Sequence, residues 1–225
     1  MRTELVSLII LLFSAICIVV NTIYLKKIYY KETKFQDEIK KHVPYVLITL
    51  VAYALISYVT IRYSVDHHWT AVLRITRMLT LFWGCYLLAC TDAKEKIIPN
   101  KVILALLVIR CAYLVVEVIV AYPFFKQSLG YPLVGAAIGG GIIALAMFIS
   151  RPGVGAGDVK LFLAIGFYVG STEIISTLLY TFLISAFVGL GMLLFGKAKL
   201  KDSVPLAPFA FLGVALEFCM LVIGG

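Results

Sequence analysis

The sequence predicts an all-α polytopic membrane protein, with about eight transmembrane helices in one bundle. The 225 residues are 62% hydrophobic and 14% charged, with a mean hydropathy of +1.03. Soluble domains are about half apolar and a quarter charged, so a chain this apolar needs a membrane to cover its surface. Apolar runs of about 20 residues, the length that crosses a hydrocarbon core, recur along the whole chain. We therefore expect residues 1–225 to form a single membrane-embedded domain.

The expected spans follow from the alternation of apolar runs with short polar segments. A basic loop over residues 26–42 separates the first two spans, and the third ends just before Asp92. Pro99 fits the first turn of the fourth, where a missing N–H costs no hydrogen bond. The fifth is rich in glycine, and the sixth is short. The expected boundaries are 5–25, 43–61, 72–90, 99–122, 134–149, 161–170, 174–195 and 204–223.

Lysine and arginine residues predict the orientation of the chain. Short cytoplasmic loops of membrane proteins carry an excess of positive charge. With eight spans, the basic loops 26–42 and 196–202 lie on the same face as the segments around Asp92 and Asp158. We expect this face to be cytoplasmic and both termini to lie outside. The net charge of +8 is then an orientation signal, and no nucleic-acid partner is expected.

The cysteines and histidines indicate no metal site. The five cysteines form no CxxC pair, and each lies in or beside an apolar run. Zinc sites need clustered thiolates or imidazoles. His67 and His68 are neighbours in an outer loop, a spacing that does not suit one ion. We expect no metal and no cofactor.

Two polar stretches each place one aspartate at the end of an apolar run. TDAKEKIIPN contains Asp92, and GVGAGDVK contains Asp158. A carboxylate at a membrane boundary is costly to desolvate and usually has a function. Because both stretches belong to one expected face, the two carboxyls are expected to share a water, one ionised and the other protonated. Such a pair hydrolyses a peptide bond without metal or nucleotide.

The residues around the aspartates also fit a second interpretation. Gly155 and Gly157 would let backbone or substrate approach closely, and they would permit a positive φ before Asp158. Glycine-rich polar loops with one aspartate also occur in transporters. On chemistry alone, a small transporter that uses Asp92 and Asp158 as proton or cation sites stays open beside the hydrolase.

Two motifs resemble those of a known enzyme family. Asp92 followed by Ile98-Pro99-Asn100 resembles the first catalytic motif of the type IV prepilin peptidases, and GxGDVK at 155–160 resembles their second, the signature of GxGD membrane aspartyl proteases. The segment 205–208 looks like the proline-containing segment near their C-terminus. The resemblance covers about residues 84–213 and favours the protease over the transporter. Presenilin-like enzymes share GxGD but place their first aspartate inside a span and lack Ile-Pro-Asn.

The resemblance implies an aspartyl endopeptidase in the cytoplasmic (inner or plasma) membrane of a prokaryote. It would cleave the short basic leader of type IV pilin-like precursors at the cytoplasmic face, before the hydrophobic helix. Its partners would be these precursors and the lipid bilayer. Asp92 and Asp158 would be the catalytic pair. The residues expected to shape the loops or a substrate groove are Pro99, Asn100, Gly155, Gly157, Lys160, Pro205 and Pro208.

The chain departs from the family pattern in the basic loop 26–42. Many bacterial members carry two CxxC pairs after the first span and also N-methylate the trimmed pilin, whereas this loop contains no cysteine. A zinc-bearing domain in the loop is therefore excluded, and we expect a peptidase only.

Some polar residues have no clear catalytic reading. Arg110 and Glu117 lie seven residues apart, so they share one face of the fourth span. A structural ion pair across neighbouring helices and a contribution to the substrate groove both stay open. Glu217, in the last span, could have a structural role or could contribute to a substrate groove. Lys160 follows Asp158 by two residues, which turns it away from the aspartate face of a helix.

The orientation can be tested with reporter fusions. Fusions at Lys96 and Ala156 are expected to report from the cytoplasm, and fusions at His67 and Gln127 from the outside. Fusions at Lys96 and Ala156 that report from opposite faces would contradict a shared water between the two aspartates.

Overall fold

A computed structural model describes residues 68–120, 125–150, 155–195 and 205–223, together with Ile16, Val19 and Ile23. The first two expected spans, apart from those three helical residues, and the basic loop 26–42 lie outside the described residues. The chain divides into two compact units, residues 1–83 and 84–225. Both aspartates belong to the second unit.

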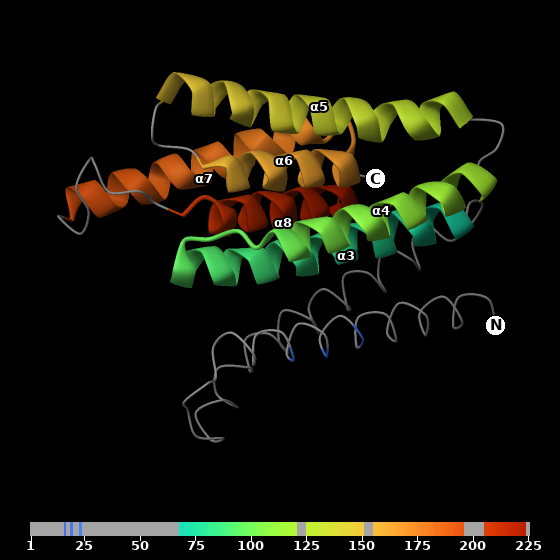
Figure 1. Cartoon of the computed structure of the whole chain (residues 1–225), viewed down its shortest axis with the longest axis horizontal. Coiled ribbons are helices and arrows are strands. Elements are labelled where there is room, and N and C mark those ends of the chain that lie inside the picture. The colour runs from blue at the N-terminus through green and yellow to red at the C-terminus, as the bar shows by residue number, and fades with distance from the viewer. Residues whose placement is uncertain are drawn as a thin grey trace. The chain divides into compact units, whose positions relative to one another are not determined.

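Every described secondary-structure element is a helix, which confirms the all-α prediction. Figure 1 shows the helices and their order along the chain. Their bounds are α3 (His68–Glu95), α4 (Asn100–Val120), α5 (Phe125–Ser150), α6 (Ala156–Val169), α7 (Ile174–Leu194) and α8 (Ala207–Ile223).

Four of the described helices contain a segment that is long and apolar enough to cross a membrane. The segments are Leu73–Glu95, Asn100–Ile119, Leu129–Ile149 and Ile174–Leu194. The α6 helix has 14 residues and α8 has 17, so both are shorter than a usual span. The six spans expected after residue 68 are thus helices, but the count of eight transmembrane spans is not confirmed.

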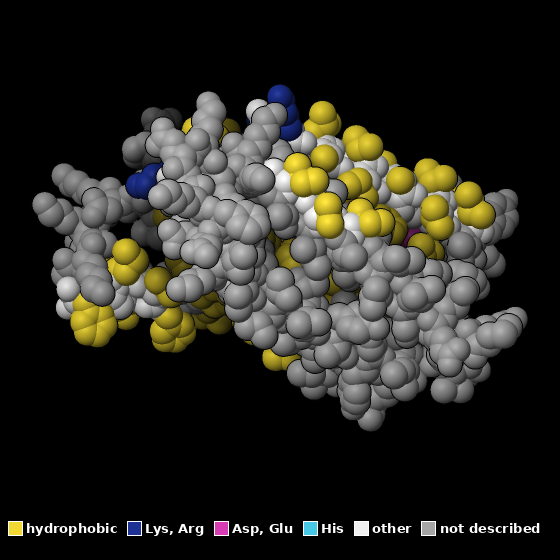
Figure 2. Space-filling view, turned by 90° about the horizontal axis from the view of Figure 1, so that it is seen from below, with side chains coloured by type: hydrophobic (Ala, Val, Ile, Leu, Met, Phe, Trp, Pro, Cys, Tyr) yellow, Lys and Arg dark blue, Asp and Glu magenta, His cyan; other side chains and the backbone are white. Residues whose placement is uncertain are grey.

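Large apolar side chains face outward from several of these helices. Ile119 of α4, Phe148 of α5 and Phe187 of α7 are each more than 70% exposed. Figure 2 shows hydrophobic side chains gathered on the visible surface of the described helices. Soluble proteins rarely expose contiguous apolar surface on this scale, so these faces suit contact with lipid.

The α3 helix ends later than the sequence predicted. The polar residues 91–95 contain no glycine or proline, and Ala, Lys and Glu are strong helix formers, so the helix continues through them. It ends at Glu95. The next residue, Lys96, has a left-handed φ of 52°, and its N–H donates to the carbonyl of Asp92 at 2.9 Å. Asp92 consequently lies on a helix, where a loop was expected.

The α6 helix begins earlier than predicted, at Ala156 rather than Leu161. An acidic residue is favourable in the first turn of a helix, because it lies at the positive end of the helix dipole. Asp158 occupies that turn, so the second aspartate is helical as well. The helix ends at Gly170, whose φ of 94° suits glycine.

Two other helix starts differ from the expected boundaries. The α5 helix begins at Phe125 and contains Pro132, and α8 begins at Ala207 instead of Val204. A proline is tolerated inside an apolar helix when neighbouring groups pair with the freed backbone. The later start of α8 leaves Pro205 outside the helix and Pro208 in its first turn.

Glycines bring the backbones of α5 and α6 into direct contact. A Cβ atom on Gly135 would overlap the carbonyl oxygen of Gly166, and one on Gly166 would overlap that of Gly135. One turn further along α5, a Cβ on Gly139 would lie 2.5 Å from the carbonyl oxygen of Phe162. Small residues four apart allow this close approach between membrane helices. The glycine-rich helix α5 therefore packs closely against α6, the helix that carries Asp158.

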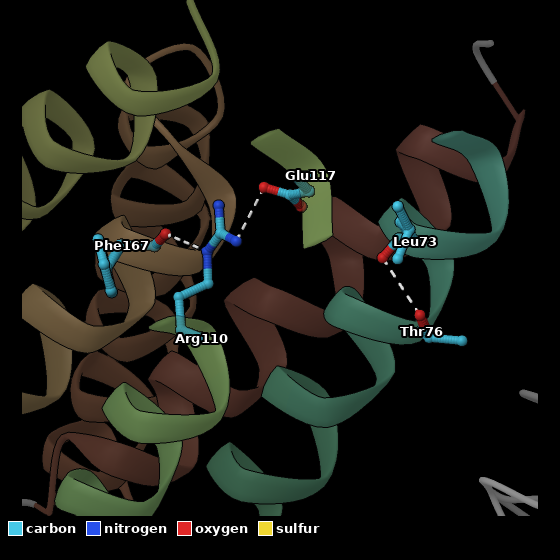
Figure 3. Close-up of polar contacts among 5 residues, drawn as sticks. All are labelled: Leu73, Thr76, Arg110, Glu117 and Phe167. Carbon is cyan, nitrogen blue, oxygen red and sulfur yellow. Dashed lines mark hydrogen bonds and ion pairs between the residues drawn. The ribbon is translucent and has the colours of Figure 1, made fainter. Parts of the chain in front are cut away.

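A buried arginine connects α4 to the far end of α6 (Figure 3). Arg110 is 1% exposed, and its Nε donates to the carbonyl oxygen of Phe167 at 2.8 Å. This oxygen belongs to the last turn of α6, where carbonyls lack helical partners and a positive charge is favourable. Arg110 Nη1 pairs with Glu117 at 3.0 Å. The expected ion pair is formed, but within α4; Arg110 crosses to the neighbouring helix through a carbonyl.

Further side-chain hydrogen bonds connect other helices of this unit. The hydroxyl of Tyr168 donates to the carbonyl oxygen of Leu106 at 2.8 Å, which adds a second bond between α6 and α4. Glu217 of α8 is buried and lies 2.6 Å from the hydroxyl oxygen of Ser176 in α7. This contact gives Glu217 a structural partner on the neighbouring helix.

The contact between α5 and α6 predicts that Gly166→Ala destabilises the protein. The added Cβ would force two backbones apart, a form of overpacking that costs about 1–3 kcal/mol. Gly141→Ala is the matched control, because nothing lies within 4 Å of the Cβ it would add. We expect Gly166→Ala to lower the thermal unfolding temperature in detergent and Gly141→Ala to leave it unchanged or slightly higher. Equal temperatures for the two variants would contradict the close packing.

Candidate active site

Asp92 lies in the last turn of α3 and faces the start of α8. Its side chain is 6% exposed, and Oδ2 accepts a hydrogen bond from the backbone N–H of Ala207 at 3.0 Å. Ala207 is the first residue of α8, where backbone N–H groups have no partner within the helix. The first acid of the candidate pair is thus bound by the N-terminus of another helix.

The prolines of segment 205–208 explain which N–H reaches Asp92. Pro208 has no N–H, and the N–H groups of Phe209 and Ala210 both donate to the carbonyl of Leu206. The N–H of Ala207 is left to bind the carboxylate. Pro205 and Pro208, expected to shape the site, flank this donor. Ala207 itself could not be predicted from the sequence, because its contribution comes from the backbone; the prolines on either side of it were the available signal.

Asp158 lies in the first turn of α6 and binds its own helix start. Its Oδ2 accepts from the N–H of Gly155 at 3.0 Å, as the acidic half of a capping box does. Gly155 precedes the helix with φ −86° and ψ 154°, an extended backbone that any residue adopts. Gly157 is helical. The expected positive φ at these glycines is therefore wrong: among the described residues, only Lys96 and Gly170 have it.

Gly157 lies close to the side chain of Ile98, whereas the predicted approach was by backbone or substrate. A Cβ on Gly157 would lie 3.1 Å from the Cβ of Ile98, shorter than the 3.5–4.0 Å of an ordinary carbon contact. Lys160 Nζ also donates to Asn100 Oδ1 at 3.0 Å. The first motif therefore touches the second at two points, although about sixty residues separate them in the sequence.

Pro99 prepares the start of α4, one residue before the helix. Its carbonyl oxygen accepts from the N–H groups of Val102 and Ile103, at 3.0 and 3.4 Å. Proline also disfavours a helical conformation at the preceding residue, Ile98. The segment between Asp92 and Asn100 is thus kept short and non-helical after Lys96.

The two carboxyls lie within electrostatic reach of each other. The pKa of Asp158, which lies outside the four apolar segments, is raised above its ordinary value. Burial is the main cause, the N–H of Gly155 opposes it, and the negative charge of Asp92 adds to it. Like charges at such range resist joint ionisation. The arrangement can therefore keep one proton on two carboxyls, as acid–base catalysis on a water requires.

No cluster of three or more His, Cys, Asp or Glu side chains suited to a metal ion occurs among the described residues.

One expectation about the first aspartate is wrong. Asp92 lies on α3 and inside the apolar segment Leu73–Glu95, so its position does not distinguish this chain from presenilin-like enzymes. The Ile98-Pro99-Asn100 sequence still does.

Comparison with known proteins agrees with these motifs. The prepilin leader peptidase/N-methyltransferase of Bacillus subtilis (strain 168) is 30% identical over 132 residues, which make up 59% of this chain and 50% of that protein. The chain thus spans about half the length of this curated relative. No solved structure matches this chain. A profile of the type IV leader peptidase family matches residues 79–194, more than half of the chain and a range that contains both aspartates. The protein therefore belongs to the type IV leader peptidase family.

Proposed function

We propose that the protein is a membrane aspartyl endopeptidase that removes the basic leader of type IV pilin-like precursors. Asp92 and Asp158 are the proposed catalytic pair. The observation that carries the proposal is that the buried Asp92 of α3 lies close enough to the partly exposed Asp158 of α6 for its negative charge to raise the pKa of Asp158. Membership of a leader peptidase family supplies the reaction class.

In the proposed reaction, the ionised carboxyl takes a proton from a water placed between the two acids. The oxygen of this water attacks the carbonyl carbon of the scissile peptide, while the protonated carboxyl gives its proton to the carbonyl oxygen. The tetrahedral intermediate then collapses, the C–N bond breaks, and the leaving amine takes a proton from the pair. The raised pKa of Asp158 favours retention of the single proton that this cycle needs.

The substrate and the membrane face of cleavage are also proposed. The name of the Bacillus subtilis relative contains prepilin leader peptidase, and we extend that substrate class to this chain. Exposed lysines surround the aspartate ends of α3 and α6, among them Lys94, Lys96 and Lys160. By the positive-inside rule this end faces the cytoplasm, where the basic leader of a precursor would lie.

We propose peptidase activity without N-methylation, although the relative's name includes both activities. The basis is the absence of cysteine from residues 26–42. The alternative of a transporter with Asp92 and Asp158 as ion sites loses its support, because the matching family is a peptidase family.

Replacement of either acid is expected to abolish cleavage. Asp92→Asn and Asp158→Asn keep the shape of the side chain but cannot ionise, so each should reduce cleavage of a pilin-like precursor by at least about a thousandfold. The double variant should lose little more, because the two residues act as one unit. Mass spectrometry of the product measures the position of cleavage and shows whether the new amine is methylated. We expect a free amine.

Glu95→Gln is the matched control for these variants. Glu95 is exposed in the same helical turn as Asp92, so its neutralisation removes the same charge without touching the pair. Membrane levels of all variants should be equal, and chelators should not change native cleavage. Substantial cleavage by Asp158→Asn would rule out the aspartyl mechanism.

Gly157 is expected to be sensitive to side-chain size. In Gly157→Ala, Ile98 has to move by only a few tenths of an ångström, so cleavage should fall slightly. Gly157→Val adds two further carbons at the same contact and should strongly reduce cleavage in a protein that still inserts. Ala156→Val places the same side chain on an exposed neighbour and should remain active. Near-native cleavage by Gly157→Val, at matched membrane levels, would show that the contact with Ile98 is irrelevant to the site.

A further inference from the structure

We propose that Lys160 and Asn100 form a clamp that sets the position of Asp158 relative to Asp92. The inference rests on the proposed function, since it assigns two positioning residues to the same site. Neither residue is proposed to touch the reacting atoms. They act through the two aspartates, by holding the helix starts next to them in register.

The clamp is a single, charge-assisted hydrogen bond between two helices. Lys160 Nζ donates to Asn100 Oδ1 at 3.0 Å, and bonds with an ionised donor are stronger than neutral ones. Asn100 is the first residue of α4, and Lys160 belongs to the start of α6. This geometry also answers why a lysine follows Asp158 by two residues: its side chain turns away from the aspartate and meets the neighbouring helix.

On the Asp92 side, the path of the chain to Asn100 is short and held by hydrogen bonds. Lys96 closes the end of α3 by donating to the carbonyl of Asp92 at 2.9 Å. The left-handed Lys96 then turns the chain toward Pro99, whose carbonyl starts α4. Asn100 follows directly. Because this connection is short, fixing the position of Asn100 also limits how far the end of α3 that carries Asp92 can move.

On the Asp158 side, the clamp complements an apolar contact. Ile98 packs against Gly157 one residue before Asp158. This contact limits how closely the connection around Ile98 can approach α6. It resists movement of that connection along the α6 axis only weakly, because van der Waals attraction is non-directional. The bond from Lys160 to Asn100 is directional, so it fixes the register that the apolar contact leaves free.

Two other hydrogen bonds join α4 and α6 further along both helices. Tyr168 binds the carbonyl of Leu106, and Arg110 binds the carbonyl of Phe167. These contacts hold the far half of α6. The bond between Lys160 and Asn100 holds the end of α6 that carries Asp158 to α4, so its loss should change chemistry more than folding.

A double-mutant cycle with Lys160→Met and Asn100→Leu tests the clamp. Both changes keep approximate side-chain length or volume and remove the bond. We expect each single variant to lower kcat on the order of 10- to 100-fold, the scale of a small misplacement of reacting groups, with KM nearly unchanged. The double variant should be no slower than either single one. Asn100→Asp retains an acceptor oxygen and should restore most of the activity.

Lys101→Met is the matched control, since Lys101 is an exposed lysine next to Asn100, and it should leave kcat and KM native. A rise in KM at native kcat would mean that Lys160 binds substrate, and the clamp would be wrong. Losses that multiply in the double variant would also overturn it, as would native kcat in Asn100→Leu.

Failure of the clamp can be separated from failure of the proposed function. Full cleavage by Asp92→Asn would refute the aspartyl mechanism whatever the clamp variants do. Thermal unfolding of the same four proteins shows whether the bond couples the two residues in the folded state. Coupling in unfolding temperature without coupling in kcat would leave the bond in place but refute its positioning role.

Discussion

Two carboxyls that repel each other have to be held close together, with Asp92 buried and Asp158 partly exposed. Burial and mutual repulsion both oppose a negative charge there, so the fold has to supply compensating groups. It does so with backbone N–H donors at two helix starts: Ala207 for Asp92 and Gly155 for Asp158. The positive ends of α8 and α6 add to the same effect. Because these donors are backbone groups, the placement of the helices determines the properties of the pair.

The α6 helix is too short to span a membrane and depends on its contacts with neighbouring helices. Its 14 residues span about 21 Å at 1.5 Å per residue, short of a hydrocarbon core of about 30 Å. Lipid offers little hydrophobic drive for helices to associate, so close packing and hydrogen bonds have to hold it. Glycines of α5 provide the packing on one side, and polar groups of α4 provide the bonds. The polar contacts around α6 are thus what a short helix in an apolar protein requires.

The sequence predicted the helical class and the described helices, because long apolar runs are a strong signal. The two aspartates were selected because each stands at the end of such a run. The prediction misplaced the helix ends at Asp92 and Asp158. Polar residues at a membrane boundary look like loops in hydropathy, yet Ala93, Lys94 and Glu95 are strong helix formers, and Asp158 suits a first turn. The roles of Gly157 and Lys160 needed the structure, since their partners Ile98 and Asn100 lie about sixty residues away. The donor Ala207 has no side-chain signal at all.

The position of both aspartates on helices changes how the site is understood. An acid in a loop moves with the loop, whereas an acid on a helix is held as precisely as the packing of that helix, which is the requirement for a shared proton. The short connection around Ile98, between Lys96 and Asn100, joins the helix that carries Asp92 to α4. That connection touches α6 at Gly157 and Lys160. The relative position of the two acids therefore depends on the same few contacts.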